Sequence, residues 1–232
     1  MAINNKQVLG NPKGRIGNVV YRNVKGKTVI SEYVANIKIS NSKNSVLNRT
    51  KFGVCTDFAV AASSINSINK VWKYSNAPGR SAYTKLIKEN IKLVEDSKPS
   101  SVSTITPQGG ISLHLMNVVI NNNSIVVEYK IDRTSNPGLL SPYTCTILAY
   151  CFNKRSENIE IDDDYFTITA NVENESGGNS ESVTFNINDY TKDSIRCFEK
   201  ARIYFAVTKI INGNMNAEWS STCFSEIDLP VM

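Results

Sequence analysis

Short runs in which hydrophobic and polar residues alternate fill the chain beyond residue 110. These runs cover residues 125–131, 166–172, 183–187, 203–207 and 217–227, and the stretch 144–152 is almost continuously hydrophobic. Turns rich in Asn, Gly, Pro and Ser separate them. A period of two is typical of strands that bury one face. The pattern therefore predicts an antiparallel β-sandwich over residues 111–232.

A period of three to four residues precedes these strands and predicts helices. Over residues 47–72 the hydrophobic positions mark one face of a long helix. An Asn-Ala-Pro-Gly sequence at 76–79 interrupts the pattern, and Ser81 is a typical N-cap for a second helix that continues to Val94. Because the break is short, we expect the two helices to form a hairpin over residues 46–98.

The first part of the chain is typical of a β-ribbon. Residues 16–24 are rich in β-branched side chains, Lys25-Gly26 supplies a turn, and residues 27–34 return as a second strand. An isolated two-stranded ribbon is marginal in water, so it must pack on the rest of the chain or on another subunit. We therefore divide the chain into a basic extended arm or ribbon (1–45), the helical hairpin, a linker (99–110) and the β-sandwich, an α+β protein.

Charge is distributed unevenly along this α+β chain. Residues 1–52 carry ten basic residues and one acid, a net charge of +9, whereas residues 99–232 carry −7. The whole chain has a net charge of +5, with 41% hydrophobic and 20% charged residues. No run is long or apolar enough for a signal peptide or a membrane span, so we expect a soluble protein made in the cytosol, without a membrane partner.

Gly26-Lys27-Thr28 is the only segment that resembles a nucleotide-binding motif, and its context excludes that function. A P-loop needs a glycine five residues before Gly-Lys-Thr, where this chain has Tyr21. A P-loop lysine also opens a helix, whereas the residues after Thr28 predict a strand. Gly26 is better interpreted as the turn of a hairpin.

Other candidate chemistry is sparse. His114 is the single histidine, and the five cysteines include no Cys-x-x-Cys pair, so a zinc site is not expected. The acidic run Asp162-Asp163-Asp164 lacks the glycine and glutamate of an EF-hand loop and is interpreted as an acidic turn. We therefore predict a protein that is not an enzyme, with no catalytic residues, no metal site and no cofactor.

The basic front of the chain is the candidate functional surface. It consists of Lys13, Arg15, Tyr21, Arg22, Lys25 and Lys27, with Gly14, Gly17 and Gly26 as backbone or turn positions. Such a ribbon can follow nucleic-acid phosphates without reading sequence. It can also dock on an acidic face of an identical neighbour, which this chain itself provides. We favour the protein contact, because a dense run of arginines is absent.

Several motifs resemble an uncharacterised family found in Bacteroidota and their phages. They are Gly-x-x-Gly-Asn-x-x-Tyr (Gly14, Gly17, Asn18, Tyr21), Gly-Lys-x-Val (Gly26, Lys27, Val29), Asn-x-x-Lys-Phe (Asn48, Lys51, Phe52) and Ser-Ala-Tyr-x-x-x-Ile-x-x-Asn (Ser81, Ala82, Tyr83, Ile87, Asn90). In that family a Gly-rich ribbon and two helices precede an immunoglobulin-like domain. The asparagine- and lysine-rich composition also looks like a virion protein of a crAss-like tailed phage.

This resemblance implies a structural virion protein, an oligomeric ring subunit at the portal, neck or tail junction that assembles through its N-terminal arm. Its partners would be copies of itself, other head, neck and tail proteins and, non-specifically, packaged DNA. It would lie in the virion, after a period in the cytoplasm of the infected bacterium. One alternative is a bacterial β-sandwich module that binds protein or glycan. Another is non-specific nucleic-acid binding by the basic segment.

Overall fold

The protein consists of two compact units, residues 1–46 and residues 47–232. The computed structural model describes residues 2–4, 13–24, 26–35, 39–121, 123–132, 142–155, 164–174, 180–211 and 216–229. We call the first unit the N-terminal sheet and the second the main unit. The prediction of an α+β fold with antiparallel sheets is confirmed.

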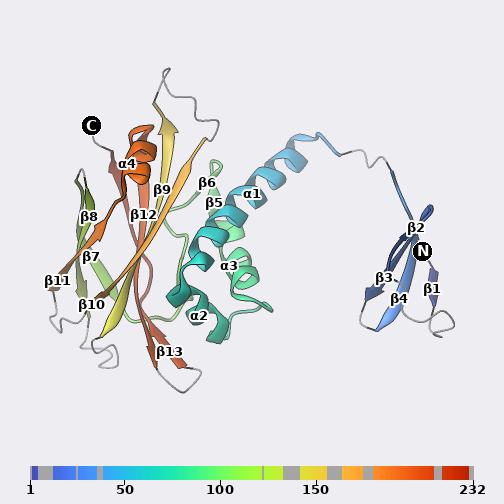
Figure 1. The fold of residues 1–232 in the computed structure, drawn as a ribbon, viewed down its shortest axis with the longest axis horizontal. Coiled ribbons are helices and arrows are strands. Elements are labelled where there is room, and N and C mark those ends of the chain that lie inside the picture. Colours follow the sequence, from blue (N-terminus) through green and yellow to red (C-terminus); the bar gives the residue numbers. More distant parts are fainter. Residues whose placement is uncertain are drawn as a thin grey trace. The chain divides into compact units, whose positions relative to one another are not determined.

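The N-terminal sheet has four antiparallel strands (Figure 1). They are β1 (Ala2–Asn4), β2 (Gly14–Ile16), β3 (Val19–Val24) and β4 (Lys27–Glu32), in the order β1-β4-β3-β2. The predicted hairpin is present, since Val24 pairs with Lys27 around the expected turn. The sheet is wider than the predicted ribbon because a second two-residue turn, Gly17-Asn18, separates β2 from β3 and β1 adds to the far edge of β4.

Two antiparallel sheets form the centre of the main unit. The larger contains β9 (Tyr143–Lys154), β10 (Phe166–Asn174), β12 (Phe198–Ile211), β13 (Asn216–Trp219) and β14 (Cys223–Asp228). The smaller contains β7 (Leu113–Ile120), β8 (Ser124–Ile131) and β11 (Ser180–Asn186). A short hairpin pairs β5 (Val94–Glu95) with β6 (Lys98–Pro99). The strand predicted over 217–227 is thus two segments, which pair in turn with one edge of β12.

The two sheets share one hydrophobic core. Alternate residues of β8 and β12, among them Val127, Tyr129, Ile203 and Phe205, point into it and are completely buried. The immunoglobulin-like connection of these strands stays a prediction.

Three helices cover the other face of the larger sheet (Figure 1). They are α1 (Lys43–Ser64), α2 (Asn66–Tyr74) and α3 (Ala82–Asn90), the last followed by the 3-10 turn η1 (Ile91–Leu93). Phe58 of α1 and Leu86 of α3 meet Leu148 and Tyr204 of the sheet in a second buried cluster. Because β9 and β12 are buried on both faces, their sequences are almost continuously hydrophobic. The helices and the sheets therefore form one unit.

The long helix predicted over 47–72 is two helices in the structure. Ile65 interrupts it with extended backbone angles, φ −79° and ψ 116°. The hydroxyls of Ser63 and Ser64 donate to the carbonyls of Val60 and Ala61, at 3.2 and 2.7 Å. Serine hydroxyls that bond back to the preceding turn compete with the helical hydrogen bonds and bend or end a helix.

Residues 99–110, predicted as a linker, are packed into the main unit. Ser100, Ser103, Ile105 and Thr106 are buried, and Ile105 belongs to the cluster beneath the helices. The indole N–H of Trp72 donates to the carbonyl of Ile105 at 2.7 Å. The Thr106 hydroxyl donates to the carbonyl of Ser220 at 2.8 Å, and the carbonyls of Pro99 and Ser100 accept from the Tyr204 hydroxyl. The segment is therefore part of the folded unit rather than a connection between domains.

The sequence analysis predicted the start of α3 but missed the start of another helix. Ser81 caps α3 as predicted: its hydroxyl accepts from the backbone N–H of Thr84 at 3.2 Å, and the Thr84 hydroxyl accepts from the N–H of Ser81. A fourth helix, α4 (Asp189–Arg196), was not predicted. Its signal was present, since Asn188 caps the helix through a 2.8 Å bond from the N–H of Thr191.

Candidate assembly surface of the N-terminal sheet

Strand register assigns each side chain of the N-terminal sheet to one of two faces. Directly paired residues of antiparallel strands share a face, and neighbours along a strand alternate. One face, which we call the basic face, carries Arg15, Val20, Arg22, Val24, Lys27 and Val29. The other, which we call the apolar face, carries Ile16, Val19, Tyr21 and Ile30, with small or polar side chains and the exposed acid Glu32 beside them. The sheet is therefore amphipathic, and among its described side chains the cations lie on one face only.

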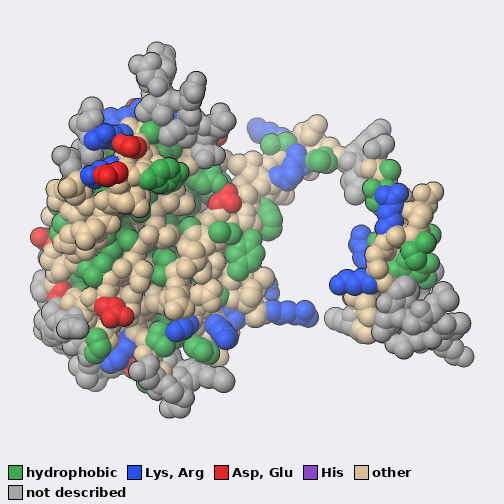
Figure 2. All heavy atoms as spheres, viewed as in Figure 1, with side chains coloured by type: hydrophobic (Ala, Val, Ile, Leu, Met, Phe, Trp, Pro, Cys, Tyr) green, Lys and Arg blue, Asp and Glu red, His purple; other side chains and the backbone are tan. Residues whose placement is uncertain are grey.

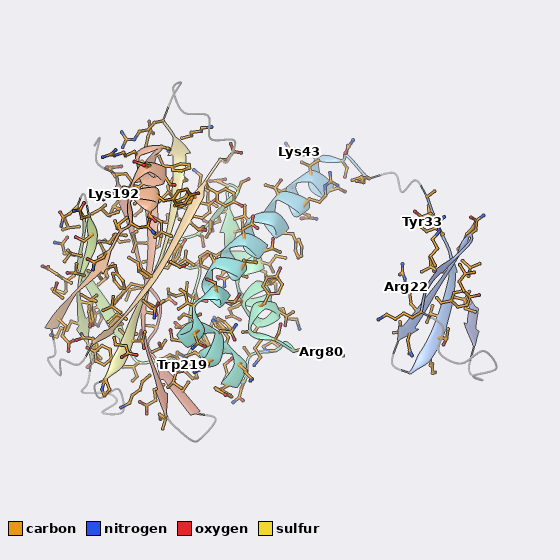
Figure 3. All side chains as sticks on the ribbon, in the orientation of Figure 1. Arg22, Tyr33, Lys43, Arg80, Lys192 and Trp219 are labelled. Carbon is orange, nitrogen blue, oxygen red and sulfur yellow. The ribbon has the colours of Figure 1, made fainter. Side chains whose placement is uncertain are left out.

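Arg15 is held in place on the basic face. Its guanidinium carbon lies 3.5 Å from the centre of the Tyr33 ring, a cation–π contact, and its Nε donates to the carbonyl of Gly17 at 2.8 Å. The backbone N–H of Tyr33 donates to the carbonyl of Asn18 at 2.7 Å, which ties Tyr33 to the same turn. Arg22 and Tyr33 are labelled in Figure 3. Within the described residues no hydrogen bond or ion pair involves the Arg22 guanidinium, so it remains available for a partner.

Glycines form both tight turns of this sheet. Gly17 has a φ of +58° and Gly26 a φ of +76°, a region that side chains with a Cβ rarely adopt. Gly17 is the first of two residues between paired Ile16 and Val19, as a type II′ turn requires. The interpretation of Gly26 as a hairpin turn is confirmed.

The structure separates the predicted surface residues. Arg15, Arg22 and Lys27 lie together on the basic face, whereas Tyr21 points to the opposite face, where it pairs with Ile30 and with Gly14 at the start of β2. Lys13 is exposed just before β2, and Lys25 lies outside the described residues. The aromatic residue that accompanies the arginines is Tyr33, which the sequence analysis did not select.

Burial in the N-terminal sheet is slight. Among the described side chains of residues 13–46, only that of Thr28 is buried. Ile16 on the apolar face is 66% exposed, and Val24 on the basic face is 50% exposed. Figure 2 shows hydrophobic and cationic side chains side by side on the surface of this unit. A sheet needs a covered hydrophobic face for stability, so these faces are suited to contact with another molecule.

The start of α1 is also exposed. The first buried residue of this helix is Val54, so about three turns precede its packed part. Val46, Leu47 and Phe52 in these turns are exposed hydrophobic residues. The first turns of α1 therefore also expose apolar side chains.

The cysteine thiols of the main unit have low reactivity. All five cysteines are unpaired, and four are buried. Burial raises the pKa of the Cys55 and Cys223 thiols to about 11 and that of the Cys145 and Cys151 thiols to about 12. A thiol reacts as its thiolate, so these groups are weak nucleophiles at neutral pH.

Other residues singled out in the sequence are dispersed. His114 is exposed on β7, and of the acidic run only Asp164 lies within the described ranges. In the part of the chain that the structure describes, His, Cys, Asp and Glu residues nowhere gather in a group of three that could hold a metal ion. None of the helices described is both long and apolar enough to cross a membrane.

Comparison with known proteins gives no family. No family model matches the chain, and no curated protein matches it. Among solved structures, a hypothetical protein from Pyrococcus horikoshii is 13% identical, with 53% of this chain and 91% of that chain covered and a TM-score of 0.23. A β-glucosidase from Kluyveromyces marxianus in complex with glucose is 8% identical, with 65% and 18% covered and a TM-score of 0.25. Likenesses at these TM-scores carry no argument about fold or function.

Proposed function

We propose that this protein is a structural subunit that assembles with copies of itself through its N-terminal sheet. The observation that carries the proposal is the amphipathic four-stranded sheet in which Thr28 alone is buried among the described side chains of residues 13–46. Such a sheet gains stability when a neighbour covers its exposed hydrophobic residues.

Charge complementarity favours a second copy as that neighbour. The segment 1–52 carries a net charge of +9, and the segment 99–232 carries −7. A basic sheet that docks on the acidic half of the next copy makes a head-to-tail contact, and head-to-tail contacts close into rings when the rotation allows it. Together with the sequence resemblance, this supports the proposal of a ring subunit at the head-to-tail junction of a phage particle.

The test compares two exposed hydrophobic residues that lie in different units. Val24 is 50% exposed on the basic face of the N-terminal sheet, and Met116 is 64% exposed on β7. We expect Val24→Glu to dissociate the oligomer, because it places a negative charge on the face that docks, and Met116→Glu to leave it intact. Sedimentation velocity measures both. A wild-type protein that stays monomeric at high concentration would contradict the proposal, as would equal effects of the two substitutions.

A second candidate function rests on the basic face. Register places Arg15, Arg22 and Lys27 on the same side of the sheet, which is the arrangement that non-specific contact with phosphates requires. If this face binds nucleic acid, affinity for random-sequence duplex falls steeply with salt, and the triple change to Gln flattens that dependence. A salt dependence unchanged in the triple variant would exclude this function.

A further inference from the structure

Trp219 and Glu89 line a pocket of about 300 Å³ in the main unit. Its walls come from the end of α2 and the loop after it, from α3, from the segment 105–108 and from β13. The lining is largely apolar and includes Trp219, Pro78 and Pro107. Its exposed polar residues are Asn76 and Gln108. A mostly apolar hollow of this size with few polar groups is typical of a specific binding site.

Trp219 is held rigidly in this pocket. Its indole N–H donates to the carbonyl of Pro107 at 2.9 Å. The indole N–H of Trp72 donates to the carbonyl of Ile105 in the same segment. A Cβ on Gly110 would lie 2.7 Å from the Trp219 ring, so the glycine leaves room for it. Trp219 itself is half-buried, and Figure 3 labels it on β13. A fixed, partly exposed indole is a surface on which a planar cation can stack.

Glu89 gives the pocket its charge. It is the only charged residue in the described lining, it is half-buried, and no hydrogen bond or ion pair to it is present among the described residues. Lys85 is nearby, but its ammonium is occupied by the carbonyls of Trp72, Lys73 and Ser75. A carboxylate without a partner, beside an indole, matches a guanidinium, which stacks on the ring and donates two hydrogen bonds to the carboxylate.

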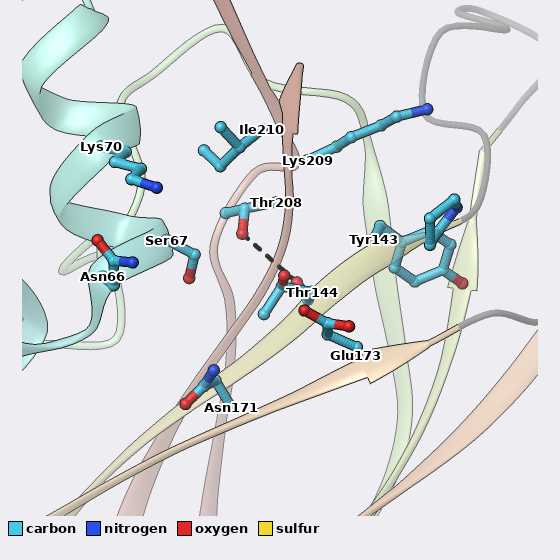
Figure 4. Close-up of a pocket in the computed structure, with 11 residues that line it drawn as sticks. Asn66, Ser67, Lys70, Tyr143, Thr144, Asn171, Glu173, Thr208, Lys209 and Ile210 are labelled. Atoms are coloured by element: carbon cyan, nitrogen blue, oxygen red, sulfur yellow. Dashed lines mark hydrogen bonds between the residues drawn. The ribbon is translucent and has the colours of Figure 1, made fainter. Parts of the chain in front are cut away.

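A larger hollow in the main unit does not have this selectivity. Its volume is about 380 Å³, and it lies between the start of α2 and the ends of β9, β10 and β12 (Figure 4). Lys70, Lys209 and Glu173 line it together, so it carries charges of both signs. The pocket at Trp219 therefore has the clearer preference, for a cation.

We propose that Arg22 of a neighbouring copy binds in the pocket formed by Trp219 and Glu89. This inference rests on the proposed assembly through the N-terminal sheet. Arg15 on the same face already stacks on Tyr33, whereas the exposed guanidinium of Arg22 has no bond within the described residues. Arg22 is thus the arginine of this face that is available for a partner. The pocket provides an aromatic ring, Trp219, and a carboxylate, Glu89, and Arg22 has neither as a partner among the described residues of its own sheet.

Charge exchange between Arg22 and Glu89 tests the contact. We expect Arg22→Glu and Glu89→Arg each to weaken self-association at least tenfold, because each leaves a buried charge unpaired or opposed. The double variant should recover most of that loss. The matched double variant of Arg22→Glu with Glu95→Arg, an exposed acid on β5, should not recover it. Sedimentation velocity measures all four.

A small probe tests the pocket itself in the full-length Arg22→Glu protein. N-acetylarginine amide should shift Trp219 fluorescence in a saturable way, whereas the uncharged N-acetylcitrulline amide should not. The arginine signal should be lost in the variant that also carries Trp219→Phe. Absence of a saturable signal, or equal signals from both probes, would overturn the binding site.

The outcomes separate this inference from the assembly proposal. If Val24→Glu dissociates the oligomer but charge exchange has no effect or shows no recovery, the Arg22 contact is wrong and the assembly proposal stands. If the protein is a monomer in which Arg22 and Glu89 are coupled, the contact between copies is wrong. If self-association is absent altogether, both fail.

Discussion

The side-chain amide of Asn90 pairs with both backbone groups of Thr104. Its Nδ2 donates to the Thr104 carbonyl at 2.9 Å, and its Oδ1 accepts from the Thr104 N–H at 2.8 Å. Asn90 is 2% exposed and ends α3, so one side chain joins the helix layer to the segment 99–110. The asparagine of the Ser-Ala-Tyr-x-x-x-Ile-x-x-Asn motif thus has a structural role.

Replacing Asn90 by Ala should lower the free energy of unfolding by about 2–4 kcal/mol. Three hydrogen bonds are lost, two to Thr104 and one to the carbonyl of Leu86, and the Thr104 N–H and carbonyl are left without partners in a partly buried site. Urea denaturation of the main unit measures the change. The neighbouring Glu89→Ala is the control and should shift stability by no more than about 0.5 kcal/mol. Equal effects of the two substitutions would contradict this role.

Lys85 should stabilise the end of α2. Its ammonium donates to the carbonyls of Trp72, Lys73 and Ser75 at 2.9, 3.2 and 2.6 Å, where the last helical carbonyls need donors. We expect Lys85→Met, which keeps the aliphatic stem, to cost about 1–3 kcal/mol of stability. Lys88→Met on the exposed side of α3 is the matched control. Thermal or urea unfolding checks both, and a neutral Lys85→Met would show that water replaces the ammonium.

The free energy of unfolding should fall in alkaline solution, because the thiols that are buried and protonated in the folded protein ionise more readily in the unfolded chain. Cys145 and Cys151 have pKa values near 12 in the folded protein because of burial, against about 8.5 in an unfolded chain. Above about pH 8.5 the unfolded state therefore releases protons first, and each thiol removes up to about 1.4 kcal/mol of stability per pH unit. Below that pH their contribution is complete.

Urea midpoints between pH 8 and pH 10, under reducing conditions, test this dependence. The variant Cys151→Ala should start less stable, because it leaves a cavity, but its stability should fall less steeply with pH. Parallel pH profiles of the two proteins would contradict a titrating thiol as the cause. The interval ends at pH 10 because buried tyrosines, whose pKa values burial also raises, add to the effect above it.

Deleting residues 1–36 should abolish assembly and leave the main unit folded. The boundary between the units lies at residues 46 and 47, and the core of the main unit contains no residue before Val54. We expect an unchanged near-ultraviolet circular dichroism spectrum and a monomer in sedimentation velocity. A truncated protein that still forms the native oligomer would show that the N-terminal sheet is not the assembly surface.

Local patterns in the sequence predicted the strands and the cap of α3. Alternation in Ile125–Ile131 and the Ser81 cap depend on neighbouring residues, which a sequence displays directly. The break at Ile65 and the helix α4 have local signals that are weak beside the hydrophobic periodicity. The packing of residues 99–110 was not predictable, because their partners, such as Ser220 and Thr222, are far away in the sequence.

The candidate surface was predicted in part. The sequence grouped Arg15, Tyr21 and Arg22 by proximity along the chain. Adjacent residues of a strand point to opposite faces, and the turn at Gly17-Asn18 decides which residues of β2 join which face. Only the strand register shows that Tyr21 lies on the face opposite to Arg15 and Arg22. The pocket at Trp219 depends on the contact of β13 with Pro107, 112 residues earlier in the chain, for which the sequence has no local signal.

The helix layer sets the order in which this protein can fold during its synthesis. Phe58 of α1 packs edge-on against Tyr204 of β12, with ring centroids 5.1 Å apart, so the first helix made is covered by one of the last strands. A nascent chain leaves the ribosome with the apolar side of α1–α3 incompletely covered until β12 has joined β9 beneath it. Chains that stop before that point expose this side to chaperones and proteases. Synthesis of β12, rather than helix formation, therefore determines when the main unit becomes stable.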